Sequence, residues 1–142
     1  MLGVITLLVI IQFFRIDKTN PAVLQKNDFI SITNPPENIK QLLKTSCYDC
    51  HSNESTYPWY TNVAPISWWV KQHINEAREE LNFSEWGAFT EKRKKHKLEE
   101  CFEMVEEGEM PLKSYLIVHD EAKLTTEQKN ELVVWFKAEH TK

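Results

Sequence analysis

The feature that most constrains this 142-residue chain is the motif Cys47-Tyr48-Asp49-Cys50-His51. Its pattern, C-x-x-C-H, is the attachment signature of c-type haem. Two thiols at this spacing can each bond one vinyl group of the same haem, and the histidine that follows can supply an axial nitrogen to the iron. We therefore predict one covalent haem c, with Cys47 and Cys50 as the thioether sites and His51 as the proximal iron ligand.

Three alternatives explain the two cysteines without haem. A thioredoxin-like redox pair shares the C-x-x-C spacing but normally lies in a βαβ pattern, which this sequence lacks. A zinc site needs two more ligands, and Cys101 and the scattered histidines form no second closely spaced pair. A disulfide between Cys47 and Cys50 leaves His51 unexplained.

The third cysteine has a simpler interpretation. Cys101 shares one face of a predicted helix with Leu98, Phe102 and Val105. We expect a small, buried core residue there, in preference to a reactive thiol.

The charge of the chain argues against nucleic acid as a partner. The formal net charge is -4, and no basic surface pattern with interleaved aromatic residues is present. Positive residues do cluster over residues 91–97, but glutamates follow at once. This pattern predicts a solvated helix face.

The N-terminus carries an apolar segment, residues 2–14, which only Gln12 interrupts. It is shorter than the ~20 residues of a full membrane span and has the length of a signal-peptide core. No basic region precedes it, and no small-residue cleavage site follows it. Either a basic region is missing or the segment is an uncleaved anchor, and both alternatives indicate export. We expect residues 1–16 to be a signal or anchor segment that attaches the protein to the periplasmic side of the inner membrane.

The rest of the chain divides into a linker and one folded domain. Asn-Pro dipeptides break residues 17–34, which we predict to be a linker, and the domain is expected over residues 35–142. Apolar spacing, caps and a terminal glycine predict helices over residues 37–46, 67–81, 90–107 and from about 126 onward. No alternating pattern typical of strands appears, so the predicted fold class is all-α, a cytochrome c-like helical domain around one haem.

Two of the predicted helices have further recognisable features. Thr125 and Gln128 have the spacing of a capping box at the start of the last helix. The helix over residues 67–81 is expected to bury an apolar stripe of Ile66, Trp69, Val70, Ile74 and Ala77.

The second axial ligand is predicted to be Met110. It lies in a loop, Gly108-Glu109-Met110-Pro111, where its thioether could be aimed inward, and methionine ligation raises the reduction potential. His119 is the alternative distal ligand, and His73 is a weaker one. Met104, on a predicted helix, is expected to be ordinary core.

Aromatic residues are dense after the motif. Indole and phenol hydrogens could bond haem propionates, or these side chains could simply build the core of a small domain. The candidate haem-pocket residues are Trp59, Tyr60 and Trp68. We also expect the second ring nitrogen of His51 to bond a backbone carbonyl near Pro58 or Pro65.

The order of these features resembles a class I cytochrome c and, more closely, the haem-binding domain family of exported bacterial proteins. The resemblance covers about residue 35 to the C-terminus. The matching blocks are residues 47–54, 57–60, 64–68, 82–86, Met110-Pro111 and Tyr115 to His119. It implies Cys47 and Cys50 as attachment sites, His51 as proximal ligand and Met110 as distal ligand. Leu112 departs from the family pattern, which leads us to expect a second proline there.

These features predict a periplasm-facing monohaem protein that transfers single electrons and is not an enzyme. Its partners would be a redox protein, which the sequence does not identify, and the membrane. The alternative is a haem-based sensor or gas-binding module with an open sixth site. A peroxidase is less favoured because only His119 offers an acid–base group. A thiol oxidoreductase is less favoured because it does not require His51.

Overall fold

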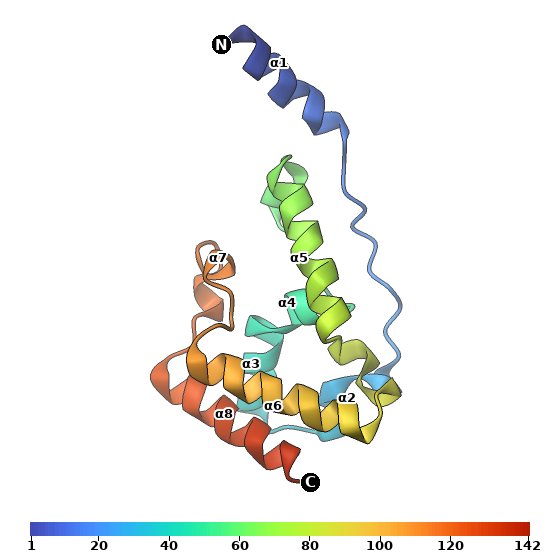
Figure 1. The fold of residues 1–142 in the computed structure, drawn as a ribbon, viewed down its shortest axis with the longest axis vertical. Helices are drawn as coiled ribbons and strands as arrows, with labels where there is room; N and C mark the ends of the chain where they lie inside the picture. The colour runs from blue at the N-terminus through green and yellow to red at the C-terminus, as the bar shows by residue number, and fades with distance from the viewer.

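The structure, a computed structural model, describes residues 1–142 and contains helices but no strands, which confirms the predicted all-α class (Figure 1). The α-helices are α1 (Leu2–Ile10), α2 (Phe29–Thr33), α3 (Glu37–Ser46), α4 (Tyr48–His51), α5 (Ile66–Glu80), α6 (Glu91–Glu107), α7 (Lys113–Leu116) and α8 (Thr126–His140). Short 3₁₀ helices are η1 (Ile11–Phe13), η2 (Gln25–Asn27), η3 (Trp59–Asn62), η4 (Phe83–Ala88) and η5 (Asp120–Ala122).

Helices α6 and α8 pack side by side and form the base of the domain (Figure 1). Local chemistry sets their ends. The Thr90 hydroxyl accepts the N–H of Arg93 at 3.3 Å, and α6 ends at Gly108, whose φ of 77° favours glycine. At the start of α8, the capping box of Thr125 and Gln128 is present. The predicted bounds of α6 and the predicted capping box are therefore confirmed.

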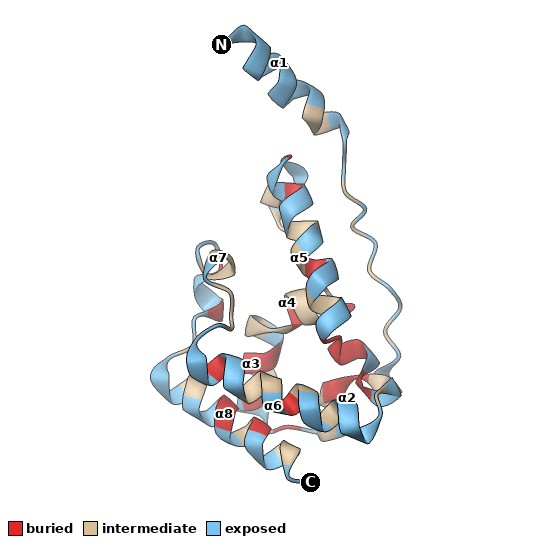
Figure 2. Cartoon of the chain, in the orientation of Figure 1, coloured by how far each residue is buried: buried red, intermediate tan, exposed pale blue.

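The core of the domain combines a cluster of aromatic rings with aliphatic side chains. The ring of Phe29 lies 4.8 Å from that of Phe83 and 4.7 Å from that of Trp86, measured between centroids. Leu43 and Phe136 pack into the same cluster. Figure 2 shows the buried residues gathered where α2, α3, α6 and α8 meet.

The folded domain includes part of the predicted linker. Phe29, on α2, is fully buried, and the Asp28 carboxylate caps that helix by accepting the N–H of Ser31 at 3.2 Å. Asp28 and Phe29 are thus buried in the folded domain, although the linker was expected to extend to residue 34. A helix of five residues is too short to show an apolar period in the sequence.

The N-terminal helix α1 extends away from the domain and buries none of its side chains (Figure 1). No helix of the structure has both the length and the apolar character needed to cross a membrane. From η1, the chain returns as an extended segment to α2.

Candidate functional site

A cavity of about 480 Å³ opens between α3, α4, the C-terminal half of α5, and α6. This volume lies in the range of small-molecule and cofactor sites. Its apolar wall includes Leu81, Phe83, Val105, Leu132 and Phe136. Cys47, Cys50, His51 and Met110 also line it. The residues predicted to attach a haem and to bind its iron therefore lie around one space.

The helical geometry of α4 explains why the motif faces this space. The N–H of His51 donates to the carbonyl of Cys47 at 2.9 Å, so residues 47, 50 and 51 share one helical face. Tyr48 points the other way. Its ring stacks on Phe83 at 5.2 Å, and its hydroxyl donates to Asp28 at 3.1 Å. Tyr48 thus anchors α4 in the core while both thiols and the imidazole face the cavity.

Two backbone carbonyls orient His51. Its Nδ1 lies 3.1 Å from the carbonyl oxygen of Ala77 and 3.1 Å from that of Leu81. Because a carbonyl can only accept, Nδ1 carries the proton, and the Nε2 lone pair remains available to a metal. Burial lowers the pKa of His51, which favours the neutral, ligating form.

The expected position of these carbonyls, near Pro58 or Pro65, was wrong. They come from the end of α5, where Leu81 is the C-cap residue. The carbonyls of a last helical turn lack partners within the helix and are free to accept from a side chain. That end of α5 packs against α4, which brings the imidazole within reach.

The thiols of the motif are unlike those of a redox pair. Burial raises the pKa of Cys47 to about 12 and that of Cys50 to about 11. Catalytic cysteine pairs instead have a lowered pKa, because the thiolate is the nucleophile. No disulfide joins the cysteines, and no cluster of three or more His, Cys, Asp or Glu side chains could hold a metal ion. The direction of these pKa shifts does not favour a thioredoxin-like pair, and the side chains around the cysteines do not form a zinc site.

Cys101 lines the same cavity, from α6. It is partly buried and packs against the core, and burial raises the pKa of its thiol as well. Cys101, which was predicted to be a core residue, thus also lines the candidate site.

Met110 is partly buried at the cavity, on the loop that links α6 to α7. Tyr115 ties this part of the chain to the motif, because its hydroxyl donates to the Asp49 carboxylate at 2.8 Å. Met104 also lines the cavity but is 44% exposed, so it is not the core residue that was expected.

His119 does not line the cavity. Its Nε2 lies 2.7 Å from the Tyr60 hydroxyl, and its Nδ1 lies 2.8 Å from a carboxylate oxygen of Glu121. Both ring nitrogens are therefore engaged in hydrogen bonds. His73 does line the cavity, and its Nδ1 lies 2.9 Å from the carbonyl oxygen of Trp69.

The candidate haem-pocket residues Trp59, Tyr60 and Trp68 lie outside the cavity lining. Trp59 is 78% exposed, and the indole N–H of Trp68 donates to the carbonyl of Phe14 at 2.8 Å. The reason is the direction of α5. Trp59, Tyr60 and Trp68 lie at or beside its first turn, whereas His51 contacts its last turn.

Arg78 is a positioning residue that the sequence did not reveal. Its Nε donates to the Ser52 carbonyl at 2.8 Å, and its Nη2 donates to Ser55 Oγ at 2.9 Å and to Asn20 Oδ1 at 2.8 Å. Arg78 thereby fixes the segment that directly follows His51. A single arginine within a charged helix carries no signal for this role.

Asn82 and Ser84 fix the same segment from η4. The Asn82 amide donates to Asn53 Oδ1 at 2.9 Å, and the N–H of Asn53 donates to Ser84 Oγ at 3.0 Å. All three are buried. Their signal was present in the sequence, since residues 47–54 and 82–86 are two of the blocks that carry the family resemblance.

Comparison with known proteins agrees with the geometry of the cavity. No curated protein and no solved structure matches the chain. A family model described as haem-binding domain matches residues 6–138 and confirms the family that the sequence blocks indicated. This match supports haem as the cofactor. The chain belongs to the haem-binding domain family.

Proposed function

We propose that the chain is a monohaem c-type cytochrome with a cytochrome c-like fold around one covalent haem. One observation carries this proposal. His51 is oriented by two carbonyls and faces a cavity that Cys47, Cys50 and Met110 also line. A redox thiol pair would not need an oriented imidazole, and a bare disulfide would not need a cavity.

Each residue has a defined task in this proposal. Cys47 and Cys50 would hold the haem through thioether bonds, and His51 Nε2 and Met110 would ligate its iron. The bound haem iron supplies one-electron chemistry by cycling between its ferrous and ferric states. The apolar wall excludes water, which favours a rapid exchange of electrons with little rearrangement.

The same geometry supports Met110 over His119 as the distal ligand. Met110 lies at the cavity on a loop that the Tyr115–Asp49 hydrogen bond ties to the motif. His119 would first have to give up a hydrogen bond to Tyr60 or Glu121.

We further propose that the protein faces the periplasm and is attached to the inner membrane by its N-terminal segment. α1 supports attachment, because it is apolar and buries none of its side chains against the domain. An unidentified redox protein would be the second partner.

The test is a visible spectrum of the oxidised and reduced protein, produced in a host that matures c-type cytochromes, followed by acid-acetone extraction. We expect haem that stays with the protein, low-spin bands and a sulfur-to-iron charge-transfer band. Met110→Ala should remove that band and lower the reduction potential, because a thioether ligand raises it. Met104→Ala is the matched control, since Met104 lines the same cavity.

Other outcomes separate the alternatives. Covalent haem with a high-spin spectrum in the unmodified protein would favour a sensor or gas-binding module with an open sixth site. Extractable haem would refute covalent attachment. An unchanged charge-transfer band in Met110→Ala would remove Met110 from the iron and turn attention to His73, which lines the cavity.

A further inference from the structure

We propose that the domain itself, and not only α1, docks on the phospholipid bilayer through the end of α5 that lies farthest from His51. We call this the apical surface, and its residues are Trp59, Val63, Ile66, Trp68 and Trp69. The proposal rests on the proposed membrane attachment of the N-terminal segment and extends it to a second contact.

The composition of the apical surface is unusual for this chain. Residues 57–69 contain no charged side chain, whereas 27% of the whole chain is charged. All five residues of the surface are exposed, with Trp59 at 78% and Trp69 at 46%. The remaining two tryptophans behave differently, since Trp86 is buried and Trp135 packs against the core. Clustered, exposed tryptophan is typical of an interaction site and of the water–lipid interface.

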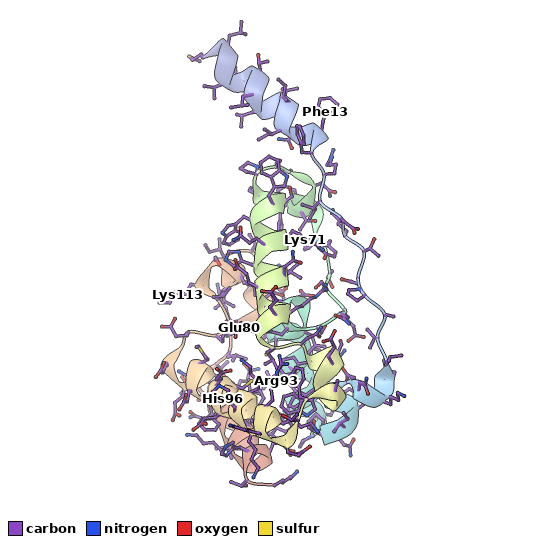
Figure 3. The ribbon with its side chains drawn as sticks, turned by 45° about the vertical axis from the view of Figure 1, so that its right-hand side comes forward. Phe13, Lys71, Glu80, Arg93, His96 and Lys113 are labelled. Carbon is purple, nitrogen blue, oxygen red and sulfur yellow. The ribbon has the colours of Figure 1, made fainter.

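Hydrogen bonds hold the end of the apolar N-terminal segment against this surface. The Gln12 amide donates to the carbonyl of Ala64 at 3.0 Å and accepts the N–H of Ala64 at 3.0 Å. Arg15 donates to the carbonyl of Asn62 at 2.6 Å. The Trp68 indole donates to the carbonyl of Phe14 at 2.8 Å. Figure 3 shows Phe13, on η1 just after α1, at the end of the N-terminal segment that lies next to the first turns of α5.

These contacts identify lipid as the partner. α1 is apolar on every side and buries no residue, so hydrocarbon is the surrounding in which its surface is stable. If α1 lies in hydrocarbon, its C-terminal end lies at the interface, where the N–H groups of Arg15 and Lys18 that do not bond Asn62 can reach the phosphates. Asp17 is the only acidic side chain in this stretch. The apical surface is bonded to that end and therefore lies at the same depth.

The inference also sets the height of the cofactor site. Ala77, which bonds His51, lies eleven positions beyond Ile66 on α5. At 1.5 Å per residue, this separation is roughly 16 Å along the helix axis. With α5 upright on the bilayer, the apical surface would hold the carbonyl of Ala77 about this far from the lipid.

The test is photocrosslinking of the full haem-loaded chain in vesicles of phosphatidylcholine and phosphatidylglycerol that contain a diazirine-bearing phosphatidylcholine. Lipid adducts are mapped by mass spectrometry, and vesicle flotation measures attachment independently. We expect adducts in residues 2–14 and in residues 57–69, and none in residues 113–119. Trp59→Gln/Trp69→Gln should lose the adducts in 57–69 while flotation and the visible spectrum stay unchanged.

The matched control is Ile117→Gln/Val118→Gln, which removes two exposed apolar side chains near α7. It should keep the adducts in 57–69. Flotation with adducts only in 2–14 would overturn this inference and leave the proposed attachment intact. Neither flotation nor adducts would overturn both. Equal adducts in 57–69 of both double variants would show that Trp59 and Trp69 do not hold the surface on lipid.

Discussion

The two ends of α5 belong to one helix, yet their aromatic neighbours face opposite surroundings. At the C-terminal end, Phe83 and Trp86 are buried in the core, beside the carbonyls that bond His51. At the N-terminal end, Trp59 and Trp69 are exposed. Aromatic density in the sequence therefore does not identify a pocket here. The direction of the helix decides which aromatic residues build the core and which ones remain outside.

The largest effect is expected at the buried end. His51→Ala removes the oriented imidazole and leaves the carbonyls of Ala77 and Leu81 without that donor, so the low-spin spectrum should disappear and the domain should lose stability. Visible absorption and thermal unfolding measure both effects. His96→Ala, on the exposed side of α6, is the control and should change neither. A His51→Ala protein with the original spectrum would contradict the assignment of His51.

Substituting one tryptophan at each end of α5 compares how much the two ends contribute to the free energy of unfolding. Trp86→Ala should lower the free energy of unfolding by about 3–5 kcal/mol, because it empties a core position. Trp59→Ala should change it by no more than about 0.5 kcal/mol, because that side chain is exposed. Urea unfolding of the haem-loaded protein, without vesicles, measures both values. Similar losses would mean that the two ends do not differ as described.

Arg78 tests how firmly the segment after His51 is held. Arg78→Ala removes three hydrogen bonds and should lower the free energy of unfolding by about 2–3 kcal/mol. Lys95→Ala, on the exposed face of α6, is the control. If Arg78→Ala were as stable as the control, the segment would be held by Asn82 and Ser84 alone.

A smaller loss than that of Arg78→Ala is expected at the end of α6 that leads to Met110. Gly108→Ala places a side chain at a φ of 77° and should cost about 1 kcal/mol of unfolding free energy. Gly3→Ala is the control, since a Cβ there meets nothing within 4 Å and α1 packs on no core residue. A neutral Gly108→Ala would indicate that the loop adapts without strain.

Much of the fold could be predicted from the sequence because its signals are local. Thr90, Gly108 and the Thr125–Gln128 pair mark helix ends through contacts within a few residues. The expected apolar stripe of α5 was less accurate. Ile74 is buried, but Ile66 and Trp69 are exposed. A periodic pattern shows which side of a helix is apolar, and it does not show how far along the helix the core extends.

The candidate site also combines features that the sequence predicts with features that depend on how the helices pack. The chemistry of Cys47, Cys50 and His51 follows from the sequence alone, whereas the helical turn α4, which places them on one face, was not predicted. The carbonyls of Ala77 and Leu81 could not be predicted, since every residue has a carbonyl and only the packing of α5 on α4 selects these two. Phe29 was missed because a single short helix between breakers has no period to detect.

The use of main-chain atoms to orient His51 has a consequence for sequence variation. A side-chain acceptor would disappear with one substitution, whereas the carbonyls of Ala77 and Leu81 persist whatever side chains those positions carry. Positions 77 and 81 can therefore diverge among relatives, within the limits of packing, without changing which imidazole nitrogen is protonated. The requirement that evolution must preserve is the path of the backbone at the end of α5, and an insertion or deletion there would be more damaging than most replacements.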